Sequence, residues 1–334
     1  MKIIESFTGF QPLEEAWMGG VYPEKFYQHL PNQIEDSFCK ITEITNKTFD
    51  QLYQKLTQLG VKVQTPIIED NIDLYMDHKE NLIKPPVTPR DWAITLGNQL
   101  LMIDQGYKKN PFQHVIDHYQ SQGEDVQIAS PYQMPWAWLS FPSIVRIGSK
   151  LILEISKTNH ELYNYSVKKI IKQWRDSGYQ IEITHTGGHA DSVFCPIKQG
   201  YVFSSHWGDP SIYEKTLPGW EVFWLPDTTK KRKRNGRWWQ KQDNWKNPSF
   251  NKFVQKYAKE WVGDSRETIF EVNMLVVDDK NVICVAEDVS GIKKMASLGI
   301  QAHVIEFPTR SFWDGAMHCV TLDIRRKGGK INYF

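Results

Sequence analysis

Cysteine is scarce in this sequence and is never clustered. The four cysteines among 334 residues are Cys39, Cys195, Cys284 and Cys319, and no two of them form a Cys-x-x-Cys pair. We therefore expect neither a disulfide scaffold, which is dense in cysteine, nor a structural zinc site, whose cysteine ligands come in closely spaced pairs. Free thiols fit a reducing compartment, so the expected location is the cytoplasm.

The sequence also lacks long hydrophobic runs and an excess of either charge. No apolar run reaches the roughly eighteen residues of a membrane-spanning helix, and mean hydropathy is −0.50. Polar residues occur within residues 1–6, so we expect no signal peptide, which would need a long apolar segment there. Forty basic and thirty-nine acidic residues give a net charge of +1, which excludes a globally basic nucleic-acid binder and an acidic disordered chain. Composition and charge therefore predict a globular protein without a membrane-spanning helix.

What the sequence does contain is a series of short apolar runs joined by tight turns. Residues 92–103 turn at Gly97-Asn98, and residues 143–155 turn at Gly148-Ser149. Glycine followed by Asn or Ser between β-rich runs favours a two-residue hairpin, because such a turn needs positive φ. Further runs predict two more hairpins and one more strand, over residues 191–203, over residues 273–285 and from Cys319 onward.

The hairpins recur at a nearly constant spacing. If Asp91, Ser143, Asp191, Asn273 and Cys319 are taken as their starts, the separations are 52, 48, 82 and 46 residues. Three separations are close to fifty, and the long one contains a candidate insertion. A repeated supersecondary unit is typical of a radial or stacked architecture.

Helix and strand patterns follow the hairpins. Residues 160–176 carry apolar side chains near a 3.6-residue period. Residues 289–298 end at Gly299, a favourable helix C-cap, before a strand predicted over residues 301–307. The unit is therefore hairpin, helix and strand, repeated about five times in an α/β fold. An ordinary α/β domain with coincidental spacing stays open as the alternative.

The interruption between the third and fourth hairpins is basic and rich in tryptophan. We place it at about residues 227–262, within a single domain that spans residues 1–334. Its central part, residues 230–246, holds eight basic residues, one acidic residue and three tryptophans. Such a segment can bind phosphate groups and stack on bases, or it can be a solvated loop whose tryptophans pack on the domain. We favour the second reading, because the chain has no other nucleic-acid-binding motif.

Three predicted hairpins begin with residues that can carry chemistry. Cys319 starts the fifth, Asp191 starts the third two residues after His189, and Asp91 starts the first. In a radial repeat the hairpin starts face a common axis, which brings a thiol, an imidazole and two carboxylates together. A cysteine with a histidine is a nucleophile with an acid–base partner, and two carboxylates suit a planar cation such as a guanidinium. Taken singly, these residues also have plain structural roles as a small buried residue, a loop cap and a surface ion pair.

At these residues the sequence resembles the amidinotransferases of the pentein superfamily, with the glycine amidinotransferases nearest. Arginine deiminases and dimethylarginine dimethylaminohydrolases are more distant members. The resemblance implies an α/β-propeller of five ββαβ units around a central active site. The matching motifs run nearly end to end: Pro12-Leu13-Glu14-Glu15, Pro89-Arg90-Asp91, His189-Ala190-Asp191, Asn273-Met274-Leu275, and His318-Cys319-Val320-Thr321 with Asp323-Ile324-Arg325-Arg326.

The resemblance also assigns roles to four residues. Cys319 matches the nucleophile that attacks the guanidinium carbon and carries a covalent amidino group. His189 matches the histidine that protonates the departing amine and deprotonates the incoming one, and Asp91 and Asp191 match the carboxylates that hold the guanidinium. A guanidinium is a poor electrophile, so it needs a strong nucleophile, fixed orientation and protonation of the leaving nitrogen. No metal and no cofactor are implied.

Two positions depart from the family pattern. Ser143 stands where amidinotransferases carry an aspartate that orients the histidine. A hydroxyl can orient an imidazole, but it cannot stabilise the cationic form as a carboxylate does. In addition, residues 205–210 contain no arginine, whereas the glycine-using enzymes carry one there for the substrate carboxylate.

The expected function is a cofactor-independent transferase that moves an amidino group from arginine or a related guanidine to an amine. Ser143 is counted among the substrate-binding residues with Asp91 and Asp191. Two alternatives stay open within the family: hydrolysis of the guanidine by water, and a changed reaction on a cationic amino acid such as ornithine. A nucleic-acid-binding module built around residues 230–246 is the less favoured reading from another class. Homo-oligomer formation stays open.

Overall fold

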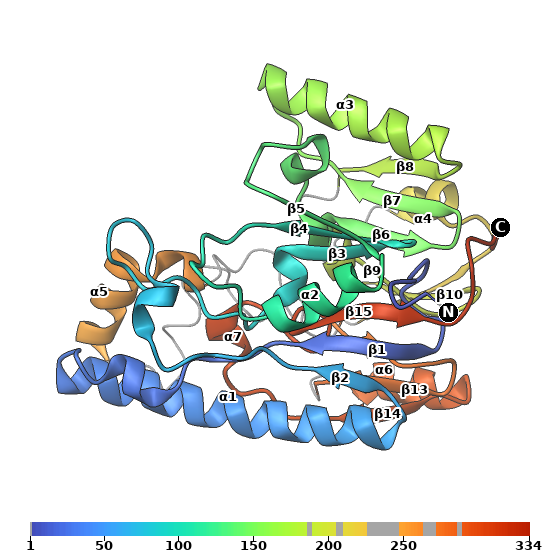
Figure 1. Ribbon diagram of the computed structural model, residues 1–334. Helices are drawn as coiled ribbons and strands as arrows, with labels where there is room; N and C mark the ends of the chain where they lie inside the picture. The colour runs from blue at the N-terminus through green and yellow to red at the C-terminus, as the bar shows by residue number, and fades with distance from the viewer. Residues whose placement is uncertain (1, 186–188, 205–209, 226–246, 263–271, 286–288) are drawn as a thin grey trace.

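The computed structural model of the chain describes residues 2–185, 189–204, 210–225, 247–262, 272–285 and 289–334. Five three-stranded sheets lie within these residues, and all five have the same build (Figure 1). The first two strands are antiparallel, and the third is parallel to the middle one. In the order first, middle and third strand, the sheets are β3 (Ala93–Leu96), β4 (Gln99–Ile103) and β5 (Asp125–Ala129); β6 (Ile144–Ile147), β7 (Lys150–Glu154) and β8 (Gln180–Thr184); β9 (Phe194–Lys198), β10 (Tyr201–Ser204) and β11 (Glu221–Trp224); β12 (Leu275–Val276), β13 (Asn281–Cys284) and β14 (Gln301–Val304); and β15 (Thr321–Arg326), β1 (Leu13–Met18) and β2 (Lys62–Gln64).

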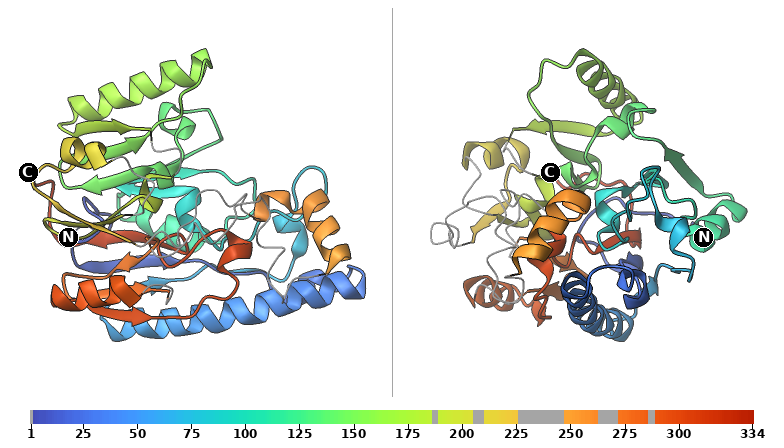
Figure 2. Two further views of the ribbon diagram at one scale, coloured as in Figure 1. Left: turned by 180° about the vertical axis from the view of Figure 1, so that it is seen from behind. Right: turned by 90° about the vertical axis from the view of Figure 1, so that its left-hand side faces the viewer.

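A helix connects the middle and third strands of every sheet. These helices lie around the outside of the strands, as the right-hand view of Figure 2 shows. They are α1 (Asn32–Gln58), α2 (Gln113–Ser121), α3 (Glu161–Asp176), α4 (Pro210–Thr216) and α6 (Val289–Ser297). The predicted unit of hairpin, helix and strand is thus confirmed, and so is the α/β fold of five such units.

The fifth sheet joins the two ends of the chain. Strand β15 pairs antiparallel with β1, from Leu13 opposite Arg326 to Met18 opposite Thr321. The sequence predicted a strand near Cys319 but not its partner. One predicted strand was also too long, because β14 ends at Val304 rather than at residue 307.

Two hairpin turns show why glycine stands between the strands. Gly97 and Gly148 have φ of +63° and +65°, as a tight turn requires. At Gly148 a Cβ atom would lie 2.0 Å from the carbonyl oxygen of Ile331, so no other residue fits without displacing the backbone.

Helix α1 is amphipathic and carries one face into the largest hydrophobic cluster. Its buried positions recur every three to four residues: Ile34, Phe38, Ile41, Thr42, Thr45, Thr48, Phe49, Leu52 and Leu56. Helix α5 (Pro248–Tyr257) packs on α1, and the ring of Phe250 lies 4.9 Å from that of Phe38. The described end of the basic segment, residues 247–262, therefore packs on the body of the protein, and Trp261 is buried there. Residues 230–246 lie outside the described residues.

The described residues include no helix that is both long and apolar enough to cross a membrane. All four cysteines are free.

Candidate active site

Five polar residues stand at equivalent places in the five sheets. Each lies one to three residues ahead of the first strand of its sheet. Asp91, Ser143 and Asp191 belong to short 3₁₀ turns, whereas Asn273 and Cys319 each lie two residues before a strand, β12 and β15 respectively. The turns of Asp91 and Ser143 contact each other, and so do those of Ser143 and Asp191. The repeat therefore gathers residues that are far apart in sequence.

Cys319 is a buried thiol on which two carboxylates act electrostatically. Burial raises its pKa well above the ordinary value, and the charges of Asp191 and Asp91 raise it further. The Asn273 amide, whose Nδ2 donates to Sγ over 2.9 Å, and the Arg90 guanidinium both act in the opposite direction. The free site thus holds a thiol that becomes a stronger nucleophile when a cation offsets the two carboxylates.

The loop that leads to Cys319 is tightly constrained. Asp314 adopts a left-handed conformation with φ of +55°. A Cβ at Gly315 would lie 2.6 Å from Cβ of Cys319, 3.4 Å from its Sγ and 3.2 Å from Cγ2 of Thr88. The absence of a side chain at position 315 therefore lets Cys319 lie close to Thr88, whose hydroxyl donates to Oδ2 of Asp91 over 2.6 Å.

Asp191 is held by the residue next to the cysteine. Nδ1 of His318 lies 2.9 Å from Oδ2 of Asp191, which is buried. Burial lowers the pKa of His318, and the Arg90 guanidinium lowers it further, while Asp191 acts against both. A neutral His318 can donate from Nδ1 to the carboxylate, and this hydrogen bond fixes the orientation of Asp191.

His189 lies at the start of the turn that carries Asp191. Its Nε2 is 3.3 Å from Oγ of Ser140, the residue ahead of the turn that holds Ser143. Ser143 is itself buried at the end of that turn. The structure thus places the hydroxyl of Ser140 within hydrogen-bond distance of His189, and a role for Ser143 at this histidine stays a prediction.

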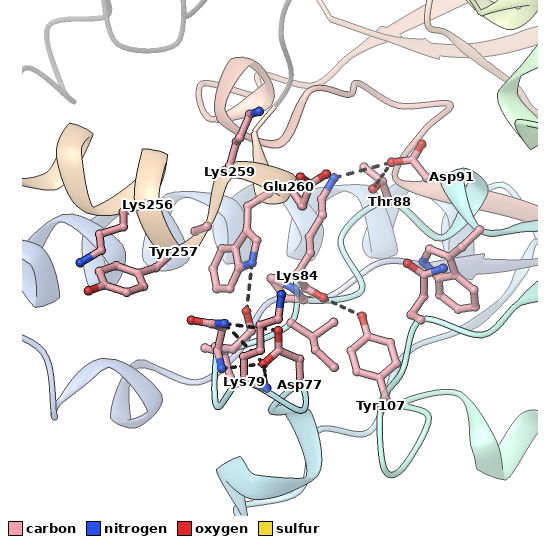
Figure 3. A pocket seen from close by; sticks show the side chains of 18 of the residues that line it. Asp77, Lys79, Lys84, Thr88, Asp91, Tyr107, Lys256, Tyr257, Lys259 and Glu260 are labelled. Carbon is pink, nitrogen blue, oxygen red and sulfur yellow. Dashed lines mark hydrogen bonds and ion pairs between the residues drawn. The ribbon is translucent and has the colours of Figure 1, made fainter. Parts of the chain in front are cut away.

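Asp91 connects this group to a large cavity. The cavity has a volume of about 710 Å³ and lies between the segment 77–85 and the segment 255–261, with Asp91 and Thr88 among its lining residues. Figure 3 shows Lys84 extending toward Asp91, and its Nζ lies 3.6 Å from Oδ2. The carbonyl of Lys84 accepts a hydrogen bond from Tyr107 over 2.6 Å. On the side of this cavity, the carboxylate of Asp91 is therefore already paired with a lysine.

A buried charge cluster supports the strand that follows Cys319. Asp323 in β15 accepts hydrogen bonds from Arg90, Arg146 and Arg326. Arg90 also donates to the carbonyl groups of His318 and Thr321, over 2.9 and 3.1 Å. The cluster thereby ties the nucleophile loop to the turn before β3.

No metal-binding arrangement occurs in this region or elsewhere in the part of the chain that the structure describes: no three His, Cys, Asp or Glu side chains are grouped so that they could hold an ion.

No protein-family model matches the chain. A curated relative, the L-arginine:L-lysine amidinotransferase of Pseudomonas savastanoi pv. phaseolicola, is 32 % identical over 62 residues. The match covers 19 % of this chain and 17 % of that enzyme, so it spans only a small part of the relative's length.

Solved structures match along the whole chain. SxtG, an amidinotransferase of saxitoxin biosynthesis from Microseira wollei, aligns with a TM-score of 0.68 over 99 % of both chains, at 18 % identity. The inosamine-phosphate amidinotransferase StrB1 of Streptomyces griseus aligns with a TM-score of 0.70 over 100 % of this chain and 99 % of its own, at 16 % identity. A dimethylarginine dimethylaminohydrolase from Pseudomonas aeruginosa gives 0.55 over 93 % of this chain and 99 % of its own, at 10 % identity.

The chain has the pentein fold. The resemblance that the sequence motifs indicated is therefore confirmed for the fold, and the similar structures named here are two amidinotransferases and a dimethylarginine dimethylaminohydrolase.

Within this pentein fold, the residues predicted for the site fall into two groups. Cys319, Asp91 and Asp191 are close enough that both carboxylates act on the thiol. His189 and Ser143 lie on the adjacent, mutually contacting turns. Their catalytic and binding roles stay predictions. Residues 205–209, most of the segment that lacks the family arginine, lie outside the described residues.

The sequence analysis gave no role to Asn273, His318, Lys84 and Ser140. Asn273 and His318 belong to motifs quoted there, and Asn273 also marks one of the five hairpin starts. Its position in the repeat was thus a usable signal, because the other four starts were all assigned to the site. Lys84 carried no such signal, since its place depends on how segment 77–85 folds over Asp91.

Proposed function

We propose that this protein is an amidinotransferase-type enzyme in which Cys319 carries the amidino group between a guanidine donor and an amine acceptor. The observation that supports this most is the buried thiol of Cys319 beside the carboxylates of Asp91 and Asp191. A thiol alone is a common buried residue, whereas a thiol between two carboxylates suits attack on a bound cation. Arginine or a related guanidine is the expected donor.

The first half-reaction begins when the guanidinium binds Asp91 and Asp191. Its positive charge offsets the two carboxylates that raise the pKa of Cys319, so the thiol loses its proton to His189 more readily. The thiolate then attacks the guanidinium carbon and forms a C–S bond. The C–N bond to the departing amine breaks as His189 returns the proton to that nitrogen, and the amidino group stays on sulfur.

The second half-reaction reverses these steps with a new amine. The acceptor nitrogen attacks the amidino carbon and gives a proton to His189 while a C–N bond forms. The C–S bond breaks, and the departing thiolate recovers the proton. Ser143 and Ser140 supply neutral hydroxyls near His189, where an aspartate would favour the imidazolium more strongly. We expect this chemistry to take place in the cytoplasm, without a metal or an organic cofactor.

The experiment that tests this proposal follows a labelled guanidino carbon. Arginine labelled there is incubated with the protein, with and without a panel of primary amines, and products and intact protein are analysed by mass spectrometry. Ornithine plus a labelled new guanidine supports transfer. Citrulline with ammonia, or labelled urea, indicates that water replaces the amine, and ornithine consumption with release of carbon dioxide indicates a different reaction.

Cys319→Ala and Cys39→Ala form a matched pair for this assay. Cys39 is a partly buried thiol on α1 outside the site. Loss of a covalent nucleophile costs orders of magnitude in rate, so the first variant should lose both turnover and the protein adduct, and the second should keep them. Turnover by Cys319→Ala above about one per cent of the wild-type rate would contradict the mechanism.

A further inference from the structure

Asn273 is the one polar hairpin start that neither the sequence motifs nor the proposed reaction gives a role. It is 1 % exposed and lies two residues before β12. Its Oδ1 accepts hydrogen bonds from the backbone N–H groups of Ala316, His318 and Cys319, each over 3.1 Å. One side-chain oxygen thus gathers three donors from the loop that carries the nucleophile.

These three bonds fix which way the amide points. Backbone N–H groups cannot donate to an NH₂ group, so the oxygen of Asn273 must face the loop. The nitrogen must then face the other way, and it lies 2.9 Å from Sγ of Cys319. The loop geometry therefore dictates an N–H···S hydrogen bond to the sulfur.

We propose that Asn273 is a positioning residue for Cys319, which shapes the nucleophile loop through its oxygen and holds the sulfur through its N–H. This inference rests on the proposed function, in which Cys319 is the nucleophile. A carboxylate in this place would accept the same backbone hydrogen bonds but would offer no N–H to the sulfur. An apolar residue would leave the buried N–H groups of Ala316 and Cys319 without this acceptor, which is costly, whereas the N–H of His318 would keep the backbone carbonyl of residue 273.

The charges around the thiol explain why this hydrogen bond matters. Asp191 and Asp91 face Cys319 from the turns before β9 and β3, and both disfavour the thiolate. Arg90, from the turn before β3, favours the thiolate of Cys319. His318, the residue before Cys319 in the chain, is paired with Asp191. Apart from Arg90, Asn273 is the main described group that favours the thiolate, so its loss should shift the protonation of Cys319 directly.

The test measures alkylation of Cys319 by iodoacetamide as a function of pH, with each cysteine quantified by peptide mass spectrometry. In Asn273→Asp the pH at half-maximal rate should rise, and the rate at pH 8 should fall about tenfold or more, as for the loss of a hydrogen bond to a charged group. Asn71→Asp is the matched control, because the Asn71 side chain only accepts a backbone N–H outside the site and aspartate can do the same. An Asn273→Asp profile that superimposes on the wild type overturns the proposal.

A second measurement needs no variant, in case Asn273→Asp fails to fold. Side-chain amide signals of ¹⁵N-asparagine-labelled wild-type protein are followed by NMR during a pH titration. The chemical shift of the Asn273 side-chain amide should change over the same pH range in which the alkylation rate of Cys319 rises. A chemical shift that stays constant over that range contradicts the N–H···S bond. Neither measurement uses a substrate. Absence of transfer from arginine would overturn the proposed function but not the pairing of Asn273 with Cys319, and an unaltered alkylation profile would overturn only the pairing.

Discussion

Replacing Asp323 by asparagine should destabilise the protein strongly, because this carboxylate is the anion at the centre of the buried charge cluster. It is fully buried and accepts from Arg90 Nη2 over 2.6 Å, Arg146 Nη2 over 2.5 Å, Arg326 Nε over 3.0 Å and Ser6 Oγ over 2.7 Å. Burial alone would raise the pKa of Asp323, but the three arginines outweigh it and hold the pKa well below its usual range.

The magnitude follows from the charges left behind. The substituted amide would keep the shape of the side chain, but three buried guanidinium groups would lose their shared anion. Removing one partner of a buried ion pair typically costs about 3–5 kcal/mol, out of a total stability of about 5–15 kcal/mol. We therefore expect the urea midpoint of Asp323→Asn at pH 7 to fall by about 1 M or more.

The assay is urea unfolding followed by tryptophan fluorescence, at pH 7 and at several lower pH values. Because the folded pKa of Asp323 lies below the unfolded value of about 3.9, its stabilisation is fully present above that value and is lost as the pH falls toward the folded pKa. The difference between wild type and variant should therefore shrink below about pH 4.

Asp176→Asn is the control for this prediction. Its ion pair with Lys172, at 2.6 Å, is exposed at the surface of α3. Exposed pairs contribute about 0–1 kcal/mol, so this variant should unfold close to the wild type. An Asp323→Asn midpoint at pH 7 that equals the control's would refute the reasoning about the cluster.

Two further predictions concern the candidate site. Asp191→Asn removes a carboxylate that raises the pKa of Cys319, so alkylation of Cys319 at neutral pH should become faster. Arginine turnover should fall at least about tenfold, because the carboxylate is expected to hold the substrate. Slower alkylation would show that the charge of Asp191 does not act on the thiol. Lys84→Met frees Asp91 from its partly exposed ion pair, so the KM for arginine should fall by up to about fivefold; a KM that rises instead would mean that Lys84 binds the substrate.

The sequence revealed most of the fold because four of the five sheets begin with strands that are adjacent in the chain. Gly97 and Gly148 mark hairpins whose strands are adjacent in sequence, and such neighbours can be recognised from turn chemistry alone. Strand β1 could not be recognised in this way. Its six residues include two glutamates, no turn joins it to β15, and its partner lies at the other end of the chain.

The sequence predicted those site residues whose side chains are reactive or charged. A thiol, an imidazole or a carboxylate marks each of them, and each stands at a hairpin start or in a recognised motif: Cys319, His189, Asp91 and Asp191. Asn273 stands at an equally informative position, but an amide has no obvious reactivity, and its role depends on three backbone N–H groups that converge only in the folded loop. The hydrogen bond between Ser140 and His189 could not be predicted, because it depends on how the turn before β6 lies against the turn before β9.

The pairing of β1 with β15 also affects the order in which the protein can assemble. The first strands and middle strands of four sheets are neighbours in the chain, so their hairpins can form as synthesis proceeds. Strand β1, in contrast, is made early and must wait for β15, which enters the sheet only after some three hundred further residues have been added. Because Cys319 lies two residues before β15, the thiol reaches its place near Asp91 and Asp191 only when β15 pairs with β1. A nascent chain that has not yet added β15 therefore leaves one edge of β1 unpaired, and Cys319 is not yet placed beside the turns of the other sheets.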